Sequence, residues 1–124
     1  MKNLATEKAP AAIGPYSQGY EANGFVFTSG QLPVNLQTGA IEEEIKAATI
    51  ASLNNVKAIV EAAGLSVNHI IKTTVFLRDM NDFPQMNEVY SEFFGNHAPA
   101  RSTVQVAKLP KDAIVEIEAI AARA

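Results

Sequence analysis

Two charged side chains in the C-terminal quarter of the sequence, Arg101 and Glu116, are of types that could carry chemistry. Arg101 opens an expected strand, and its planar guanidinium could hold a carboxylate or phosphate through two parallel hydrogen bonds. Glu116 lies between two β-branched apolar residues, where partial burial would raise its pKa and suit it to proton transfer or to holding a water molecule. An ion pair of Arg101 with Glu116 or Glu118 at a subunit interface is the alternative for both.

Four further residues could line a small polar site, namely Tyr16, Ser29, Gly30 and Asn87. Tyr16 follows a Gly-Pro pair, where a tyrosine commonly packs with its hydroxyl at the surface. Ser29 and Gly30 form a strand-end turn, and bare backbone N–H groups beside a glycine can hold an anion. Asn87 shares a helix side with aromatic residues, and a buried asparagine bonded to backbone explains it equally well.

Other kinds of site are disfavoured by composition. The 124 residues contain no cysteine, which excludes a disulfide framework, a thiolate zinc site and a cysteine nucleophile. His69 and His97 lack metal-ligand spacing, so we expect no metal, and the glycines are too dispersed for a phosphate-binding loop. The net charge of −3 argues against nucleic-acid binding. Without a signal pattern or an apolar run of ~20 residues, a cytoplasmic location without membrane contact is expected.

The elements that must position these residues follow from turn signals and hydrophobic periodicity. Residues 19–22 and 25–29 are extended runs around Asn23-Gly24, which predicts a hairpin because both turn residues accept positive φ. Steps of three and four residues then predict a helix with the apolar stripe Ile45, Thr49, Leu53, Val56, Val60 and Ala63. Glutamates at 42–44 suit the N-terminus of this helix, and Gly64 suits the position just past its end.

The second half of the chain continues the alternation of strands and helices. Residues 70–77 are rich in β-branched side chains and predict a strand. A second helix is expected with Asn81 as its N-cap, Pro84 in its first turn and Gly95 at its end. Its apolar stripe comprises Phe83, Met86, Tyr90, Phe93 and Phe94.

Two last strands, at 101–107 and 113–122, complete the order ββ-α-β-α-ββ. The sequence therefore predicts an α+β fold in one domain of residues 1–124, with two helices covering one face of a sheet.

The other face of this sheet has a mixed character. One side of the last strand combines large apolar groups with carboxylates: Ile114, Glu116, Glu118 and Ile120. We place Arg101 on the mixed face too, together with Thr103. A monomer would leave this face wet and an oligomer would bury it, so we expect a homo-oligomer.

Motifs along nearly the whole chain match a known family in the same order. They lie at residues 9–19, 28–33, 55–59, 72–76, 87–90, 99–104, 107, 109–112 and 115–118. With these motifs the chain resembles the reactive intermediate deaminase A family, also called the RidA or YjgF family.

The resemblance implies a chorismate-mutase-like α+β fold and a homotrimer, in which three sheets pack into a central barrel with a site in each interface cleft. It implies hydrolysis of the 2-imino acids 2-iminobutanoate and 2-iminopropanoate, which pyridoxal-phosphate dehydratases release, to 2-oxo acids and ammonia. Neither a cofactor nor a metal is implied. The partners are small 2-imino and 2-oxo carboxylates.

The same resemblance assigns roles to residues. Arg101 would clamp the substrate carboxylate and Glu116 would orient the attacking water. The cleft would be lined by Tyr16, Ser29, Gly30, Asn87 and Thr103, the last of which stands where many members have cysteine. A non-catalytic trimeric module that binds small carboxylates is the alternative. Nucleic-acid cleavage is a third and less favoured possibility.

Overall fold

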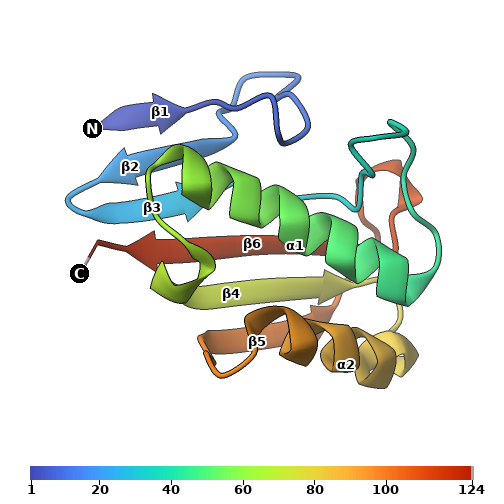
Figure 1. Cartoon of the computed structure of the whole chain (residues 1–124). Helices are drawn as coiled ribbons and strands as arrows, with labels where there is room; N and C mark the ends of the chain where they lie inside the picture. Colours follow the sequence, from blue (N-terminus) through green and yellow to red (C-terminus); the bar gives the residue numbers. More distant parts are fainter. Residues whose placement is uncertain (124) are drawn as a thin grey trace.

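The computed structural model describes residues 1–123 as a mixed six-stranded sheet with two long helices packed on one face (Figure 1). The strands are β1 (Lys2–Leu4), β2 (Gly19–Ala22), β3 (Phe25–Thr28), β4 (Ile70–Leu77), β5 (Ala100–Gln105) and β6 (Val115–Ala122). The helices are α1 (Ile45–Ala62) and α2 (Phe83–Phe94). The predicted α+β architecture is therefore confirmed.

The strand order across the sheet is β1-β2-β3-β6-β4-β5. Strand β5 pairs in parallel with β4, and all other neighbours are antiparallel. The last strand, β6, therefore lies in the middle of the sheet, where its alternate side chains enter the core. The short β1 was missing from the sequence prediction, because three residues carry no readable periodicity.

The hairpin of β2 and β3 forms as the Asn-Gly pair predicts. Asn23 and Gly24 have φ values of 52° and 80°, so both turn residues adopt the positive φ that a type I′ turn requires. The turn fixes the register that pairs Tyr20 with Phe27.

The helix ends agree with the sequence in α1 and differ in α2. Glu44 is the N-cap of α1 and accepts a hydrogen bond from the backbone N–H of Lys46, and Gly64 follows its end with a φ of 81°. Asn81 is not the N-cap of α2. It lies in a 3₁₀ turn, Met80–Asp82, that precedes the helix and is itself capped by Asp79. The extra turn arises because the Asp79 carboxylate accepts from the N–H of Asn81 at 2.9 Å.

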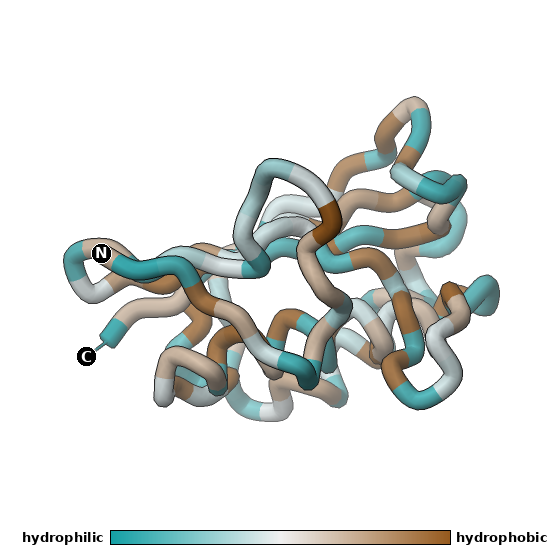
Figure 2. The backbone as a smooth tube through the Cα atoms, turned by 90° about the horizontal axis from the view of Figure 1, so that it is seen from above, coloured by the Kyte–Doolittle hydropathy of each residue, from teal (hydrophilic) through white to brown (hydrophobic). Residues whose placement is uncertain are grey.

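The core lies between the helices and the sheet, and Figure 2 shows both helices on the same side of the sheet. Strand β6 supplies Val115, Ile117, Ala119 and Ala121 to this core, each at most 2 % exposed. Ile114 was expected on the mixed face, but it precedes β6 and packs into the core at 6 % exposure.

The opposite face of the sheet carries no helix. Tyr20, Phe25, Phe27 and Val104 lie on it, each with more than 40 % of its surface exposed. The predicted mixed face thus exists, with Glu116 and Glu118 among these apolar groups. None of the helices within residues 1–123 has the length and apolarity of a membrane span.

Candidate active site

Arg101 lies on the helix-covered face of β5, not on the mixed face where we expected it. Its register partner on β4 is Thr73, which is 1 % exposed and points toward α2. The alternation of side chains along β5 then sends Arg101 and Thr103 to the helix side and Ser102 to the open side. The sequence alone could not assign this face, because it depends on the register between β4 and β5.

The guanidinium of Arg101 is held by one side of α2. Its central carbon lies 5.3 Å from the centroid of the Phe83 ring and 4.8 Å from that of Tyr90, and the two rings are called the aromatic shelf below. Nη1 donates a 2.7 Å hydrogen bond to Oδ1 of Asn87. Phe83, Asn87 and Tyr90 are spaced four and three residues apart, which places them on one helix side.

The aromatic shelf is itself anchored from below. The hydroxyl groups of Tyr90 and Thr73 share a buried 2.6 Å hydrogen bond, and burial raises the pKa of Tyr90 above its usual range. Strand β4 therefore supports the ring on which Arg101 rests. Sequence reasoning assigned no site role to Phe83, Tyr90 or Thr73, and the signal that could have found them is their aromatic and polar spacing on α2 and β4.

Arg101 keeps most of its hydrogen-bonding capacity. Among residues 1–123, the contact with Asn87 is the one hydrogen bond that its guanidinium makes, and none of the ion pairs in this range includes Arg101, Glu116 or Glu118. No ion pair between Arg101 and either glutamate therefore forms among the described residues of one copy, and the alternative of such a pair across a subunit interface stays a prediction. A cation stacked on aromatic rings with free N–H donors is suited to binding a carboxylate.

Thr103 lies two residues beyond Arg101 on the same face. Its hydroxyl oxygen is buried without a hydrogen-bond partner among residues 1–123. A buried polar atom of this kind is uncommon in folded proteins and requires an explanation.

Glu116 occupies the opposite face, where the backbone at Gly30 packs closely against its carboxylate. Its neighbours Val115 and Ile117 are fully buried, so the alternation along β6 points Glu116 away from the helices. A Cβ atom added to Gly30 would lie 2.8 Å from the carboxylate carbon of Glu116. Only glycine therefore allows this approach. Burial, and secondarily the negative charge of Glu118, raises the pKa of Glu116 above its usual range.

The backbone around Gly30 is fixed from two sides. Gln31 and Ile117 exchange backbone hydrogen bonds of 2.7 and 3.1 Å, which ties the segment to β6. The amide of Asn55 on α1 donates to the carbonyl of Val34 at 3.0 Å. The segment is therefore held close to the Glu116 carboxylate.

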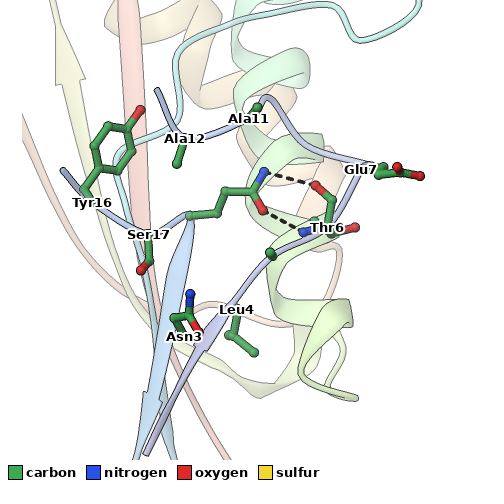
Figure 3. A pocket seen from close by; sticks show the side chains of 10 residues that line it. Asn3, Leu4, Thr6, Glu7, Ala11, Ala12, Tyr16 and Ser17 are labelled. Carbon is green, nitrogen blue, oxygen red and sulfur yellow. Dashed lines mark hydrogen bonds between the residues drawn. The ribbon is translucent and has the colours of Figure 1, made fainter. Parts of the chain in front are cut away.

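Ser29 and Tyr16 lie near the N-terminal segment. Ser29 Oγ donates to the carbonyl of Ser17 at 2.6 Å, and the Ser29 N–H donates to the carbonyl of Gln18 at 2.8 Å. Tyr16, which is 55 % exposed, lines a pocket of about 410 Å³ beside residues 3–7 (Figure 3).

Gln18 organises this segment and was not assigned a role from the sequence. Its buried amide accepts from the N–H of Thr6 at 2.7 Å and donates to the carbonyls of Thr6, Ala9 and Pro10. The N-terminal segment is therefore fastened beside Tyr16.

The predicted site residues thus form two groups that the sheet separates. The first group, on the helix side, comprises Arg101, Asn87 and Thr103. The second group comprises Glu116 and Gly30 on the other face, together with Ser29 and Tyr16 beside the N-terminal segment. No group of three His, Cys, Asp or Glu residues among residues 1–123 is arranged to hold a metal ion.

A six-stranded mixed sheet with two helices on one face places the chain in the class of two-layer α+β proteins. The endoribonuclease L-PSP family matches residues 6–123. The chain belongs to this family, and the resemblance to the RidA or YjgF proteins, which are the same family, is confirmed.

Individual relatives are similar over nearly their whole length. The chain is 58 % identical to the 2-iminobutanoate/2-iminopropanoate deaminase of Salmonella typhimurium and 57 % identical to that of Escherichia coli, with 98 % of each chain covered. The crystal structure of E. coli TdcF with bound serine has 57 % identity and a TM-score of 0.96 over 100 % of both chains. The E. coli YjgF gene product has 56 % identity and the same TM-score and coverage.

Proposed function

We propose that this chain hydrolyses 2-iminobutanoate and 2-iminopropanoate to the corresponding 2-oxo acids and ammonia. The observation that carries the proposal is Arg101, which is stacked on the aromatic shelf and held by Asn87 but paired with no carboxylate among residues 1–123. Relatives named for this activity are 57–58 % identical over nearly the full chain.

The reaction needs one oriented water molecule. Arg101 binds the substrate carboxylate and fixes the planar imine, and Glu116 accepts a proton from the water as its oxygen bonds to the imine carbon. The electron pair of the carbon–nitrogen double bond moves onto the nitrogen of the protonated imine, which gives a neutral carbinolamine. Glu116 passes its proton to this nitrogen and then accepts the hydroxyl proton as the carbon–oxygen double bond forms and the carbon–nitrogen bond breaks. Glu116 gives that proton to the departing ammonia, which leaves as ammonium. Holding water and imine together replaces a bimolecular encounter by a local one. The imine carbon is already electrophilic, so the residues named here suffice for the proposed step.

The two groups of site residues come from different copies of the chain. Arg101 and Glu116 lie on opposite faces of one sheet, so a single copy cannot direct both at one small molecule. The apolar open face supplies the contact surface, because exposed patches of this kind mark association sites. We propose a homotrimer in which each interface joins Arg101, Asn87 and Thr103 of one copy to Glu116, Gly30, Ser29 and Tyr16 of the next.

The remaining residues bind the substrate. The buried Thr103 hydroxyl gains an acceptor when a carboxylate lies on Arg101, which accounts for its lack of a partner among the described residues. The N–H of Gly30 supplies a donor, Ser29 holds this backbone in place through Ser17 and Gln18, and Tyr16 closes the cleft. A short-lived imine must meet the enzyme where it forms, so the proposal includes a cytoplasmic location beside the pyridoxal-phosphate dehydratases.

A trapping assay tests this function. A threonine dehydratase generates 2-iminobutanoate with semicarbazide present, and the semicarbazone is followed with the parent protein, Arg101→Ala and Glu116→Ala. We expect suppressed trapping with the parent alone. Arg101→Lys is the matched control for charge, and we expect it to recover little activity because an ammonium lacks the planar fork.

The outcome also separates an enzyme from a binding module. Glu116→Ala should keep its affinity for 2-oxobutanoate and lose turnover. A parent protein that binds 2-oxobutanoate through Arg101 but hydrolyses no imine would support the non-catalytic module instead.

A further inference from the structure

Residues 30–34, called the Gly30 segment below, follow strand β3 and begin with the glycine that packs against the Glu116 carboxylate. Gly30 has no side chain that could hold it in place. Pro33, near the other end of the segment, has no backbone N–H group to donate. Other parts of the chain must therefore set the position of the Gly30 segment relative to Glu116.

Strand β6 holds the Gly30 segment at a single residue. Gln31 forms an isolated antiparallel bridge with Ile117, in which each N–H donates to the carbonyl of the other residue. Because Ile117 is the residue after Glu116, this bridge sets where the segment lies along β6. A bridge at one residue leaves the segment free to rotate about it, so a second attachment must define the angle of the segment.

Asn55 on α1 supplies this second attachment. Its Nδ2 donates to the carbonyl of Val34 at 3.0 Å and to the carbonyl of Leu32 at 3.3 Å. An amide nitrogen carries two hydrogens, so the two bonds use its whole donor capacity. Among residues 1–123, no other hydrogen bond joins α1 to the Gly30 segment. Asn55 is 3 % exposed, and the exclusion of water strengthens both bonds.

The helix that carries Asn55 is itself held firmly by the core. Val56 and Ile59 on α1 are fully buried against the sheet, so the amide of Asn55 has a fixed origin. The contact also requires asparagine. Aspartate has a similar shape but no N–H group, and glutamine is one methylene longer. The Gly30 segment is therefore held between β6 and α1, and the Glu116 carboxylate lies against it.

We propose that Asn55 is a positioning residue for Glu116, which it keeps in place through the backbone of the Gly30 segment without touching substrate. This inference rests on the proposed function, in which Glu116 accepts a proton from the attacking water. Without the Asn55 amide the segment can swing away from the carboxylate, which then gains room to leave the water. A displacement of about 1 Å can cost a catalytic group ~10²-fold in rate.

Variants of Asn55, each assayed well below its thermal midpoint, test this assignment. Asn55→Asp removes both N–H donors at nearly constant shape, and Asn55→Ala removes the whole amide. Both should lower kcat for 2-iminobutanoate about tenfold or more and change KM less than about threefold, because Arg101 still binds the substrate carboxylate. Asn55→Gln keeps both donors and should recover part of the loss. Val56→Ala is the control, since it loosens α1 at a fully buried position, and it should keep the parental kcat.

Either of two results would overturn the positioning role of Asn55. One is a parental kcat in Asn55→Ala, and the other is an equal loss of kcat in Asn55→Ala and Val56→Ala, which lower stability alone would explain. A parent that hydrolyses no imine would count against the proposed function instead, and NMR would then decide about Asn55. The carboxylate carbon resonance of Glu116, assigned with Glu116→Gln, should move in Asn55→Ala and keep its parental position in Val56→Ala. An unmoved resonance in Asn55→Ala would reject the role.

Discussion

At the scale of single residues, Glu116 is held in surroundings that disfavour its charge. It is partly buried, and Glu118 carries a like charge two residues away on the same face. Both effects raise its pKa, so the folded chain binds a proton more tightly than the unfolded chain. The same surroundings make the carboxylate a stronger base toward a bound water.

A dependence of stability on pH follows from this raised pKa. As pH rises above the ordinary carboxyl pKa of 4.5, the unfolded chain loses this proton first, and the folded state therefore loses stability. Glu116→Gln should raise the thermal midpoint at pH 7 and leave it unchanged at pH 3, as measured by calorimetry. Glu43→Gln, at an exposed position, is the control. A stabilisation that is equal at both pH values would contradict this account.

Gly30 provides a second prediction at the residue scale. Gly30→Ala brings a methyl group against the Glu116 carboxylate, which must move. A shift of about 1 Å in a catalytic group can cost ~10²-fold, so kcat should fall by about that factor with 2-oxobutanoate affinity largely kept. Adding Glu116→Asp, which shortens the side chain, should recover part of the loss. Failure of the double variant to exceed Gly30→Ala would argue against crowding as the cause.

The sequence predicted the chemical identity of both central residues and the face of Glu116, but not the face of Arg101. Arg101 and Glu116 were chosen for their functional groups and their strand context, and these features are local. Their placement on opposite faces depends on the parallel register of β5 with β4, which pairs residues 28 positions apart, as with Thr73 and Arg101. A pairing of this kind leaves no periodic signal in either strand.

At the scale of elements, α2 acts as the support for Arg101. Its helical spacing aligns Phe83, Asn87 and Tyr90, and β4 holds Tyr90 through Thr73. Periodicity predicted both helices and β4 because their apolar stripes are long. It misplaced the start of α2, because Asp79 and Asn81 both have the chemistry of a cap and only the tertiary path selects between them.

A double-mutant cycle can measure how strongly the hydroxyl groups of Tyr90 and Thr73 are coupled. Tyr90→Phe and Thr73→Val each leave a buried hydroxyl unpaired, so each should cost about 1–3 kcal/mol in the free energy of unfolding. The double variant should cost less than the sum of both, since it leaves neither hydroxyl unpaired. Urea denaturation measures all four proteins, and strictly additive losses would show that the hydroxyls are not coupled.

The aromatic shelf can be separated from this anchor. Tyr90→Phe keeps the ring beneath Arg101 and should keep KM within about twofold of the parent. Tyr90→Leu removes the ring and should raise KM for 2-iminobutanoate several-fold at similar kcat. Equal KM values for the two variants would show that the ring does not position Arg101.

At the scale of the whole molecule, the uncovered sheet face is the surface through which we propose that copies associate. Its aromatic and aliphatic groups are exposed in one copy and surround Glu116 and Glu118. The alternation in the last strand predicted this face correctly. The number of copies and their relative orientation came only from the resemblance, because no pattern within one chain specifies a rotation axis.

A charged side chain placed on this face should dissociate the proposed homotrimer. Phe27→Asp, in the middle of β3, should convert the proposed trimer to monomers in analytical ultracentrifugation and abolish imine hydrolysis. Ile50→Asp is a matched control, because Ile50 and Phe27 are both 43 % exposed but Ile50 lies on α1. A monomeric Phe27→Asp protein with parental activity would refute a site shared between copies.

The opposite placement of Arg101 and Glu116 also has a genetic consequence. In the proposed trimer, Arg101→Ala and Glu116→Ala should each inactivate every site, yet the two substitutions fall on different copies at each interface. When both variants are produced together and assemble at random, about one quarter of the interfaces join an intact Arg101 to an intact Glu116. Two null alleles would therefore complement each other within a single assembled particle. A chain that needs both groups from one copy would show no such rescue.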